Sequence, residues 1–470
     1  MSRESALVKN TIIIAIGKIC TQFVSFFLLP FYTNVLTTEE FGAVDLLNTL
    51  VGLLLPIVTF QVEQAVFRDL IEIRHQEKEK REVVSSAFFS VCLQCLVFFI
   101  IVLLAAPLIQ NRYLHFLAAN VIASIFSSLF LQIARGLGNN VSYAFGSFVS
   151  AASTIGFNVL FLAVWEMGAA GMLLGTLLGN IVCALYLFLS LHLYKYISLR
   201  SFVSRIIKKL WEYSLPLVPN AISWWVFNAS DRVIVSAALG LSQNGVLSAA
   251  SKFSSAYIGI YNVFNISWTE SVALHLNDQD GEEFFNRMFQ KALGMFFGMA
   301  AGLIAVLPFV FPIMVNEAYD AGYGLAPILI LASLCNCLIG LISAIYIANR
   351  NTKAVAHTSI IAAFVNIAAH LGLIQFVGLY AAAVSTLASF GVMSLYRLYD
   401  IQKRYFKIQI PRPFLLKTFA AFSVILAGYY LDTIYLKEAA FLLAVLYAWD
   451  LNKDFFFLFL GKVKDKMVRR

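Results

Sequence analysis

Charged residues are scarce in this chain. Asp, Glu, Lys and Arg make up 13% of its 470 residues, whereas 60% are hydrophobic. Soluble domains average about 25% charged residues. The chain has no long polar stretch that could fold as a soluble catalytic domain, and apolar runs of about 18 or more residues, long enough to cross a bilayer as helices, recur throughout. The composition therefore predicts an all-α polytopic membrane protein.

Catalytic and metal-binding motifs are missing as well. The sequence contains no G-x-x-x-x-G-K-[ST] loop and no HExxH pair, which argues against nucleotide hydrolysis and zinc-dependent hydrolysis. The six cysteines all fall within apolar runs, and none has the second ligand pair that a zinc site needs. We therefore expect no cofactor, no metal and no enzymatic activity.

The positive charge indicates topology rather than nucleic-acid binding. The net charge is +8, and the basic residues concentrate in every second junction between apolar runs. The positive-inside rule then places both termini in the cytoplasm. About fourteen membrane-spanning helices are expected, at residues 8–36, 42–67, 83–109, 113–134, 141–165, 169–194, 213–239, 244–272, 288–315, 323–349, 354–376, 378–399, 415–433 and 436–458.

The last predicted helix is interrupted by charge. Asp450, Lys453 and Asp454 fall within its apolar stretch. The following residues, 455–460, are therefore expected either to complete the span or to lie flat at the inner surface of the membrane.

The chain is predicted to consist of two similar halves. When Gly42 is aligned with Gly245, polar or small residues recur in both copies at steps of three or four, which is one helical face. The expected parts are an N-lobe of six helices at 1–194, a cytoplasmic linker at 195–212, a C-lobe of six helices at 213–400, and two further helices with a basic tail at 401–470. Because both six-helix groups start and end inside, a parallel repeat about the membrane normal is expected.

The linker has two possible interpretations. Its apolar residues fall on one helical face and its basic residues lie off that face, which is typical of an amphipathic helix at the inner leaflet. The alternative is a solvated basic loop.

Charges at membrane depth mark the candidate site. Residues 213–253 are apolar enough to cross a bilayer twice, with a turn expected at LSQNG (241–245), yet they carry Asp231, Arg232 and Lys252. A charge at the membrane centre costs about 2.5 to 3.5 kcal/mol on insertion scales, so such residues usually face a bundle interior or a wet path. With Lys18 in the first helix, Arg232 and Lys252 predict a cationic cavity suited to an anionic head group. Asp231 and Lys252 could form a structural ion pair, or they could serve substrate binding or coupling.

Further polar residues are expected to line the same cavity, because they lie on polar faces of predicted helices. For a single amide or hydroxyl, the alternative is a hydrogen bond that only packs the bundle; for Trp224, stacking on a sugar competes with plain packing. His370, which shares a helical face with Asn366, could carry a coupling proton or could be a hydrogen-bonded bundle histidine. The other predicted cavity residues are Gln22, Asp45, Asn220, Trp224, Asn228 and Asn262.

Three stretches resemble a known family. NTIIIAIGKICTQFVSFFLLPFYTNVLTTEEFGAVDLL (10–47), ARGLGN (134–139) and NASDRVIVSAALGLSQNGVLSAASKF (228–253) are similar to the Wzx-type oligosaccharide-lipid flippases. These form the polysaccharide-transporter branch of the MOP superfamily, which also contains the MATE drug exporters and the lipid II flippase. The resemblance implies two six-helix lobes around a cavity, with cavity cations at Lys18 and Lys252.

The resemblance also implies a function. It implies a bacterial or archaeal plasma membrane, membrane lipids and a polyprenyl-diphosphate-linked oligosaccharide as ligands, and the polysaccharide polymerase and glycosyltransferases of the same pathway as partners. We accordingly expect a flippase for cell-surface polysaccharide biosynthesis that works by alternating access of its two lobes. The alternatives are a MATE-like cation-coupled drug or metabolite antiporter, which favours an acidic cavity, and a membrane enzyme, which needs a catalytic outer loop that the sequence lacks.

Overall fold

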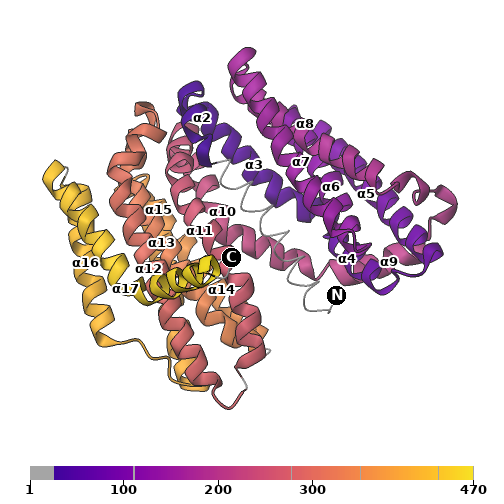
Figure 1. Ribbon diagram of the computed structural model, residues 1–470. Coiled ribbons are helices and arrows are strands. Elements are labelled where there is room, and N and C mark those ends of the chain that lie inside the picture. Colours follow the sequence, from indigo (N-terminus) through magenta and orange to yellow (C-terminus); the bar gives the residue numbers. More distant parts are fainter. Residues whose placement is uncertain (1–25, 109–111, 277, 350, 432, 469–470) are drawn as a thin grey trace. The chain divides into compact units, whose positions relative to one another are not determined.

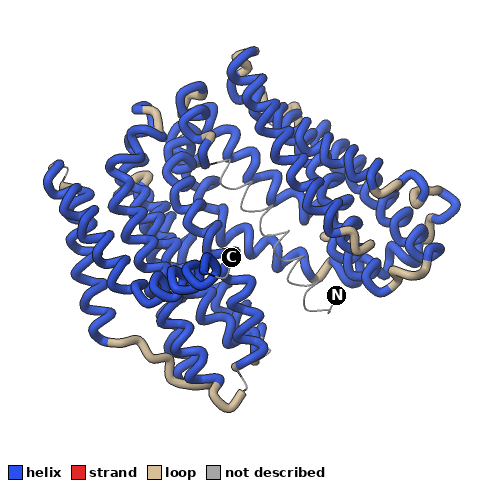
Figure 2. The backbone as a smooth tube through the Cα atoms, viewed as in Figure 1, coloured by secondary structure: helices blue, strands red, loops and turns tan. Residues whose placement is uncertain are grey.

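The computed structural model describes residues 26–108, 112–276, 278–349, 351–431 and 433–468. Throughout these ranges the regular elements are helices and no strand occurs, as Figure 2 shows. The all-α class predicted from composition is thereby confirmed. The chain divides into two compact units, Met1–Gly245 and Val246–Arg470. The boundary between them in the sequence falls within the helix α11 (Leu241–His275), which is labelled in Figure 1.

Unit 1 contains the shorter connecting helices as well as long apolar ones. Its elements are α2 (Leu29–Val35), α3 (Thr38–Thr59), α4 (Val62–Glu72), α5 (Glu77–Ala105), α6 (Leu114–Gly136), α7 (Asn140–Val159), the π-helical η1 (Leu160–Val164), α8 (Gly168–Ser190), the 3₁₀ turns η2 (Leu193–Lys195) and η3 (Leu199–Ser201), α9 (Ser204–Ser214), α10 (Leu217–Leu239) and the first turn of α11 (Leu241–His275).

Unit 2 is built from long helices with few connections. After the remainder of α11, its elements are α12 (Gly281–Met314), the 3₁₀ segment η4 (Glu317–Leu325), α13 (Ala326–Ala348), α14 (Thr352–Val377), α15 (Tyr380–Arg404), α16 (Arg412–Tyr430) and α17 (Ile434–Val468).

The observed helices follow the predicted spans closely. From residue 29 onward every predicted range overlaps a helix or a pair of consecutive helices. Within the described part of the chain, ten helices are long and apolar enough to cross a membrane. The agreement arises because the thickness of a bilayer sets the length of an apolar run and the length of the helix alike.

The second predicted span is broken in two. Phe60 and Gln61 separate α3 from α4, and both adopt positive φ angles, 52° and 58°. The Thr59 hydroxyl donates to the Leu55 carbonyl at 2.9 Å and accepts from the Gln61 amide at 3.1 Å. This side chain therefore provides an acceptor for the Gln61 amide at the break between the two helices.

The predicted linker (195–212) overlaps most of the helix α9 (Ser204–Ser214), in which Leu210 is buried and Lys208 is exposed on a different face. The segment that precedes α9 is hydrogen-bonded to α5. The Ser85 hydroxyl donates to the Tyr196 carbonyl at 2.6 Å, and the Val203 amide donates to the Ser86 hydroxyl at 2.9 Å. The helical interpretation of this segment holds over Ser204–Ser214. Its location at the inner leaflet and the division of the chain into lobes stay predictions.

A buried arginine joins three helices of unit 2. Arg397 of α15 is 2% exposed. Its guanidinium donates to the Thr358 hydroxyl at 2.9 Å and to the Val355 carbonyl at 3.0 Å, both on α14, and to the Ser343 hydroxyl on α13. A planar fork of donors can meet several acceptors at once, so this side chain fixes α13, α14 and α15 against each other.

The final helix is continuous. The backbone of α17 is helical over Ile434–Val468, through the charged positions that interrupt its apolar stretch. At the helical rise its 35 residues extend for about 52 Å, which exceeds the hydrocarbon thickness of about 30 Å. The helix is therefore long enough to span and to continue past the membrane.

Candidate functional site

The first turn of α3 is held by a capping box. The Thr37 hydroxyl accepts from the Glu40 amide at 3.2 Å, and the Glu40 carboxylate accepts from the Thr37 amide at 3.1 Å. The second Glu40 oxygen accepts from the Ala169 amide at the start of α8, at 3.4 Å. One carboxylate thus accepts hydrogen bonds at the N-termini of two helices, where unpaired amides and the helix dipole favour a negative charge.

Two glycines bring the first turns of α3 and α11 into contact. A β-carbon on Gly42 would lie 1.9 Å from the Leu241 carbonyl oxygen, and one on Gly245 would lie 1.9 Å from the Thr38 carbonyl oxygen. The two contacts are related by the same sequence offset that aligns Gly42 with Gly245. The turns around Gly42 and Gly245 therefore pack against each other through reciprocal contacts, at a separation that only glycine permits.

An ion pair lies directly beside this contact. Arg232 of α10 donates from Nε to Asp45 Oδ2 of α3 at 2.9 Å, and the side chains are 25% and 17% exposed. Asn244 of α11, which is fully buried, donates from Nδ2 to the Gly42 carbonyl at 2.9 Å and reaches the same Asp45 oxygen at 3.5 Å. Three helices therefore converge on one carboxylate, and we call Asp45, Arg232 and Asn244 the α3–α10–α11 cluster.

Two further bonds flank the cluster. Trp225 of α10 donates from its indole nitrogen to the Thr49 carbonyl at 2.8 Å, about three turns into α3. At the opposite end the hydroxyls of Thr38 and Ser242 lie 2.7 Å apart. The whole set runs along one face of α3 and binds it to α10 and to the beginning of α11.

The remaining predicted residues of unit 1 are not part of this cluster. Lys18 and Gln22 lie outside the described residues. Asn220 and Trp224 are exposed on α10, and Asp231 is partly exposed one position before Arg232. Asn228 is placed by its backbone within α10, and its side chain lies outside the described part.

Three predicted residues belong to unit 2. Lys252 is partly buried on α11 and Asn262 is exposed further along the same helix. His370 and its helical neighbour Asn366 are fully buried on α14. Since Asp231 and Lys252 fall in different units, the ion pair suggested for them stays a prediction. In the described ranges no group of three or more His, Cys, Asp or Glu side chains could hold a metal ion.

Sequence reasoning missed Asn244. The LSQNG segment was expected to be a turn because Gly, Asn and Ser are typical of turns, and that prediction is wrong: α11 begins at Leu241, and Gly240 alone, with φ of 93°, separates it from α10. Asn244 is therefore a helical residue that faces α3. The alignment of Gly42 with Gly245 was the one signal in the sequence that pointed to this place.

The fold is shared with solved transporters. The structure is similar to the lipid II flippase MurJ in an inward closed conformation, with a TM-score of 0.68 and 17% identity over 96% of this chain and 100% of that one. It is also similar to an inward-facing multidrug resistance MATE family transporter of the MOP superfamily, with a TM-score of 0.65 and 14% identity over 83% of this chain and 98% of that one. At these identities the likeness establishes the fold.

Sequence comparison identifies the family. No curated protein gives a significant match to the chain. The family described as polysaccharide biosynthesis protein matches residues 7–268, which is more than half of the chain and includes the α3–α10–α11 cluster. The chain therefore belongs to the polysaccharide biosynthesis protein family.

Proposed function

We propose that the protein is a flippase that moves a polyprenyl-diphosphate-linked oligosaccharide from the inner to the outer leaflet of a bacterial or archaeal plasma membrane, for cell-surface polysaccharide biosynthesis. The family match over residues 7–268 is the observation that carries this proposal. Membership of this family, together with a transporter fold, supports translocation rather than catalysis. Both termini are proposed to be cytoplasmic, with the polymerase and glycosyltransferases of the pathway as partners.

The chemistry of such a substrate determines what the protein must provide. A diphosphate that carries sugars cannot enter hydrocarbon unaided, because its charges and hydroxyls lose their hydration there. Cations and amide or indole donors can replace that hydration. We assign the cations to Lys18, Arg232 and Lys252, and the sugar contacts to Gln22, Asn220, Trp224, Asn228 and Asn262.

The α3–α10–α11 cluster supports a role for Arg232 that changes during transport. In this structure its charge is balanced by Asp45 at 2.9 Å. If α3 and α10 separate, the guanidinium loses this partner, and a phosphate oxygen becomes the natural replacement, because guanidinium binds carboxylate and phosphate with the same fork geometry. Asp231, one position away, and the buried His370 are the candidates for coupling a proton to this change.

The α3–α10–α11 cluster also supports alternating access. The positive-inside rule places the Gly240 end of α10 and the first turn of α3 at the outer face. The close glycine contact and the ion pair would keep that face closed, and outward release of a bulky substrate would require both to open. The closed cluster is thus proposed as the outer gate.

The proposal is tested by transport in proteoliposomes. A polyprenyl-diphosphate-linked oligosaccharide with a fluorescent sugar is incorporated, and its appearance in the outer leaflet is followed by access of a membrane-impermeant quencher. We expect the wild-type protein to increase the rate. Lys18→Ala and Lys252→Ala are expected to reduce it by an order of magnitude or more, since a buried charged hydrogen bond contributes about 1.5 to 3 kcal/mol, and Lys252→Arg is expected to retain much of it.

The control is Lys291→Ala, which removes an exposed lysine of α12 and should leave the rate unchanged. Unaltered transport in both the Lys18 and Lys252 variants would refute the cationic cavity. Failure of the wild-type protein to move this substrate, combined with export of cationic drugs, would favour the antiporter instead.

A further inference from the structure

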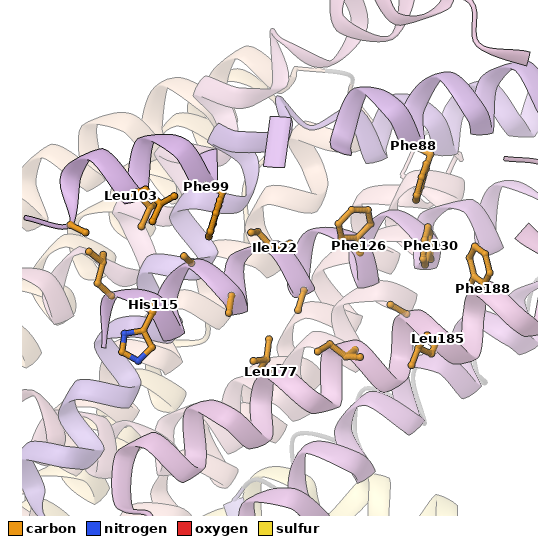
Figure 3. Close-up of a pocket in the computed structure, with 18 residues that line it drawn as sticks. Phe88, Phe99, Leu103, His115, Ile122, Phe126, Phe130, Leu177, Leu185 and Phe188 are labelled. Atoms are coloured by element: carbon orange, nitrogen blue, oxygen red, sulfur yellow. The ribbon is translucent and has the colours of Figure 1, made fainter. Parts of the chain in front are cut away.

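A long apolar groove lies in unit 1 between α5, α6 and α8 (Figure 3). It has a volume of about 870 Å³ and is open to one side. Of the 18 residues that line it, His115 is the one whose side chain carries a nitrogen or oxygen atom. A groove of this composition offers a surface for hydrocarbon and excludes the sugar part of the proposed substrate.

The shape of the groove follows from residue size. The α6 residues that line it alternate between large ones, such as Phe126, and small ones, such as Ala118 and Ala123, which are 4% and 8% exposed. Its walls are formed by large residues that project from the neighbouring helices, including Leu103 of α5 and Leu185 of α8, which are 56% and 55% exposed. Small side chains between large ones leave a furrow that runs along the helix axes.

The length of the groove is comparable to the full thickness of the hydrocarbon core. The lining residues of α5 run from Phe88 to Ala106, which is about 27 Å at the helical rise. The hydrocarbon core measures about 30 Å, so one leaflet accounts for about 15 Å. A phospholipid acyl chain anchored in one leaflet covers about half of the groove, whereas a polyisoprenyl chain, which is far longer, can occupy all of it.

The two ends of the groove differ in chemistry. At one end His115 is exposed, and the exposed Arg112 lies three residues before it. The other end contains a cluster of aromatic rings, in which Phe130 is stacked on Phe88 at 6.3 Å and contacts Phe188 at 6.2 Å (Figure 3). One end is therefore polar, and the aromatic end offers ring surfaces to an apolar chain.

We propose that this groove holds the polyisoprenyl chain of the lipid-linked substrate during translocation, an inference that rests on the proposed function. The lining along α5 is longer than one leaflet of the hydrocarbon core. The diphosphate can therefore pass from one leaflet to the other while its chain stays in contact with the same protein surface. The contact supplies apolar binding energy that does not depend on the sugar sequence.

Photo-crosslinking tests the occupant. A photoreactive phenylalanine analogue is placed at Leu103, at Leu185 or, as a matched control, at Ile101. Ile101 is 57% exposed, lies on the opposite side of α5 from Leu103 and does not line the groove. With labelled polyprenyl diphosphate in phospholipid proteoliposomes, we expect capture at positions 103 and 185 to exceed capture at position 101 several-fold. Equal capture at all three positions, or capture of phospholipid alone, would show a surface covered by ordinary membrane lipid and would overturn the inference.

A bulky substitution in the groove tests whether the rate of translocation depends on it. Leu103→Trp narrows it, and Ile101→Trp adds the same bulk at the same depth on the other face. We expect the first variant to slow translocation several-fold and the second to match the wild type, with equal amounts of folded protein. If the wild type flips the substrate and both variants do so equally fast, the groove has no part and the proposed function stands. If the wild type itself moves no lipid-linked oligosaccharide, the proposed function fails, whatever the groove captures.

Discussion

Gly42 allows the backbones of α3 and α11 to lie in direct contact. A β-carbon at this position would lie 1.9 Å from the Leu241 carbonyl oxygen and 2.7 Å from the Gly245 amide nitrogen. Both are backbone atoms, so a side-chain rotation cannot relieve the clash. We expect Gly42→Ala to destabilise the protein by about 1 to 3 kcal/mol, as overpacked sites do, seen as a lower melting temperature of the purified protein.

The control for this change is Gly156→Ala. Gly156 lies within α7, and an added β-carbon meets no atom within 4 Å. Here alanine should stabilise the helix by about 0.5 to 1 kcal/mol, because glycine has the greater freedom to lose on folding. If Gly42→Ala melts at or above the wild-type temperature while Gly156→Ala behaves as expected, the contact between the two turns is looser than described.

At the scale of elements, the α3–α10–α11 cluster makes alternating access testable without substrate chemistry. The hydroxyls of Thr38 and Ser242 are 2.7 Å apart, so cysteines at these positions would place two sulfurs close to bonding distance. We expect the Thr38→Cys, Ser242→Cys double variant to form a disulfide under mild oxidation, to lose transport when oxidised and to regain it on reduction.

The single variants serve as controls, since they carry the same native cysteines and should respond to oxidation as the wild type does. A cross-linked protein that still transports would mean that α3 and α11 need not separate at this end. The proposed outer gate would then be a fixed structural contact.

The helices could be predicted from the sequence, but their partners could not. Apolar length determines where a span begins and ends, so the predicted ranges agree with the observed helices. Asp45 and Arg232 were both recognised as unusual, yet they are 187 positions apart in the chain, and no local pattern shows that they meet. The break at Phe60 and Gln61 was not predicted for a related reason: neither residue is Gly or Pro, so the local sequence does not indicate the positive φ angles found there.

At the scale of the whole chain, residues far apart in the sequence meet at the turns around Gly42 and Gly245. The sequence alignment of Gly42 with Gly245 predicts that these two turns correspond. The structure adds that these corresponding turns touch, through contacts that the same offset interchanges. The predicted internal repeat would account for both the similarity of the two segments and the presence of glycine in each, because a contact near a two-fold axis constrains both copies equally.

The side of the membrane on which the C-terminus lies is the remaining prediction at this scale. The α17 helix is continuous over Ile434–Val468. If it crosses the membrane as the last of fourteen spans, the number of spans is even and the C-terminus is cytoplasmic. A fluorescent protein fused after Arg470 should therefore fluoresce, and alkaline phosphatase fused there should be inactive, because the phosphatase folds only in an oxidising compartment. Fusions after Leu431, between α16 and α17, should give the reverse pattern. Active phosphatase at both points would mean that α17 does not cross the membrane, and the basic C-terminal residues would then have to be explained without the positive-inside rule.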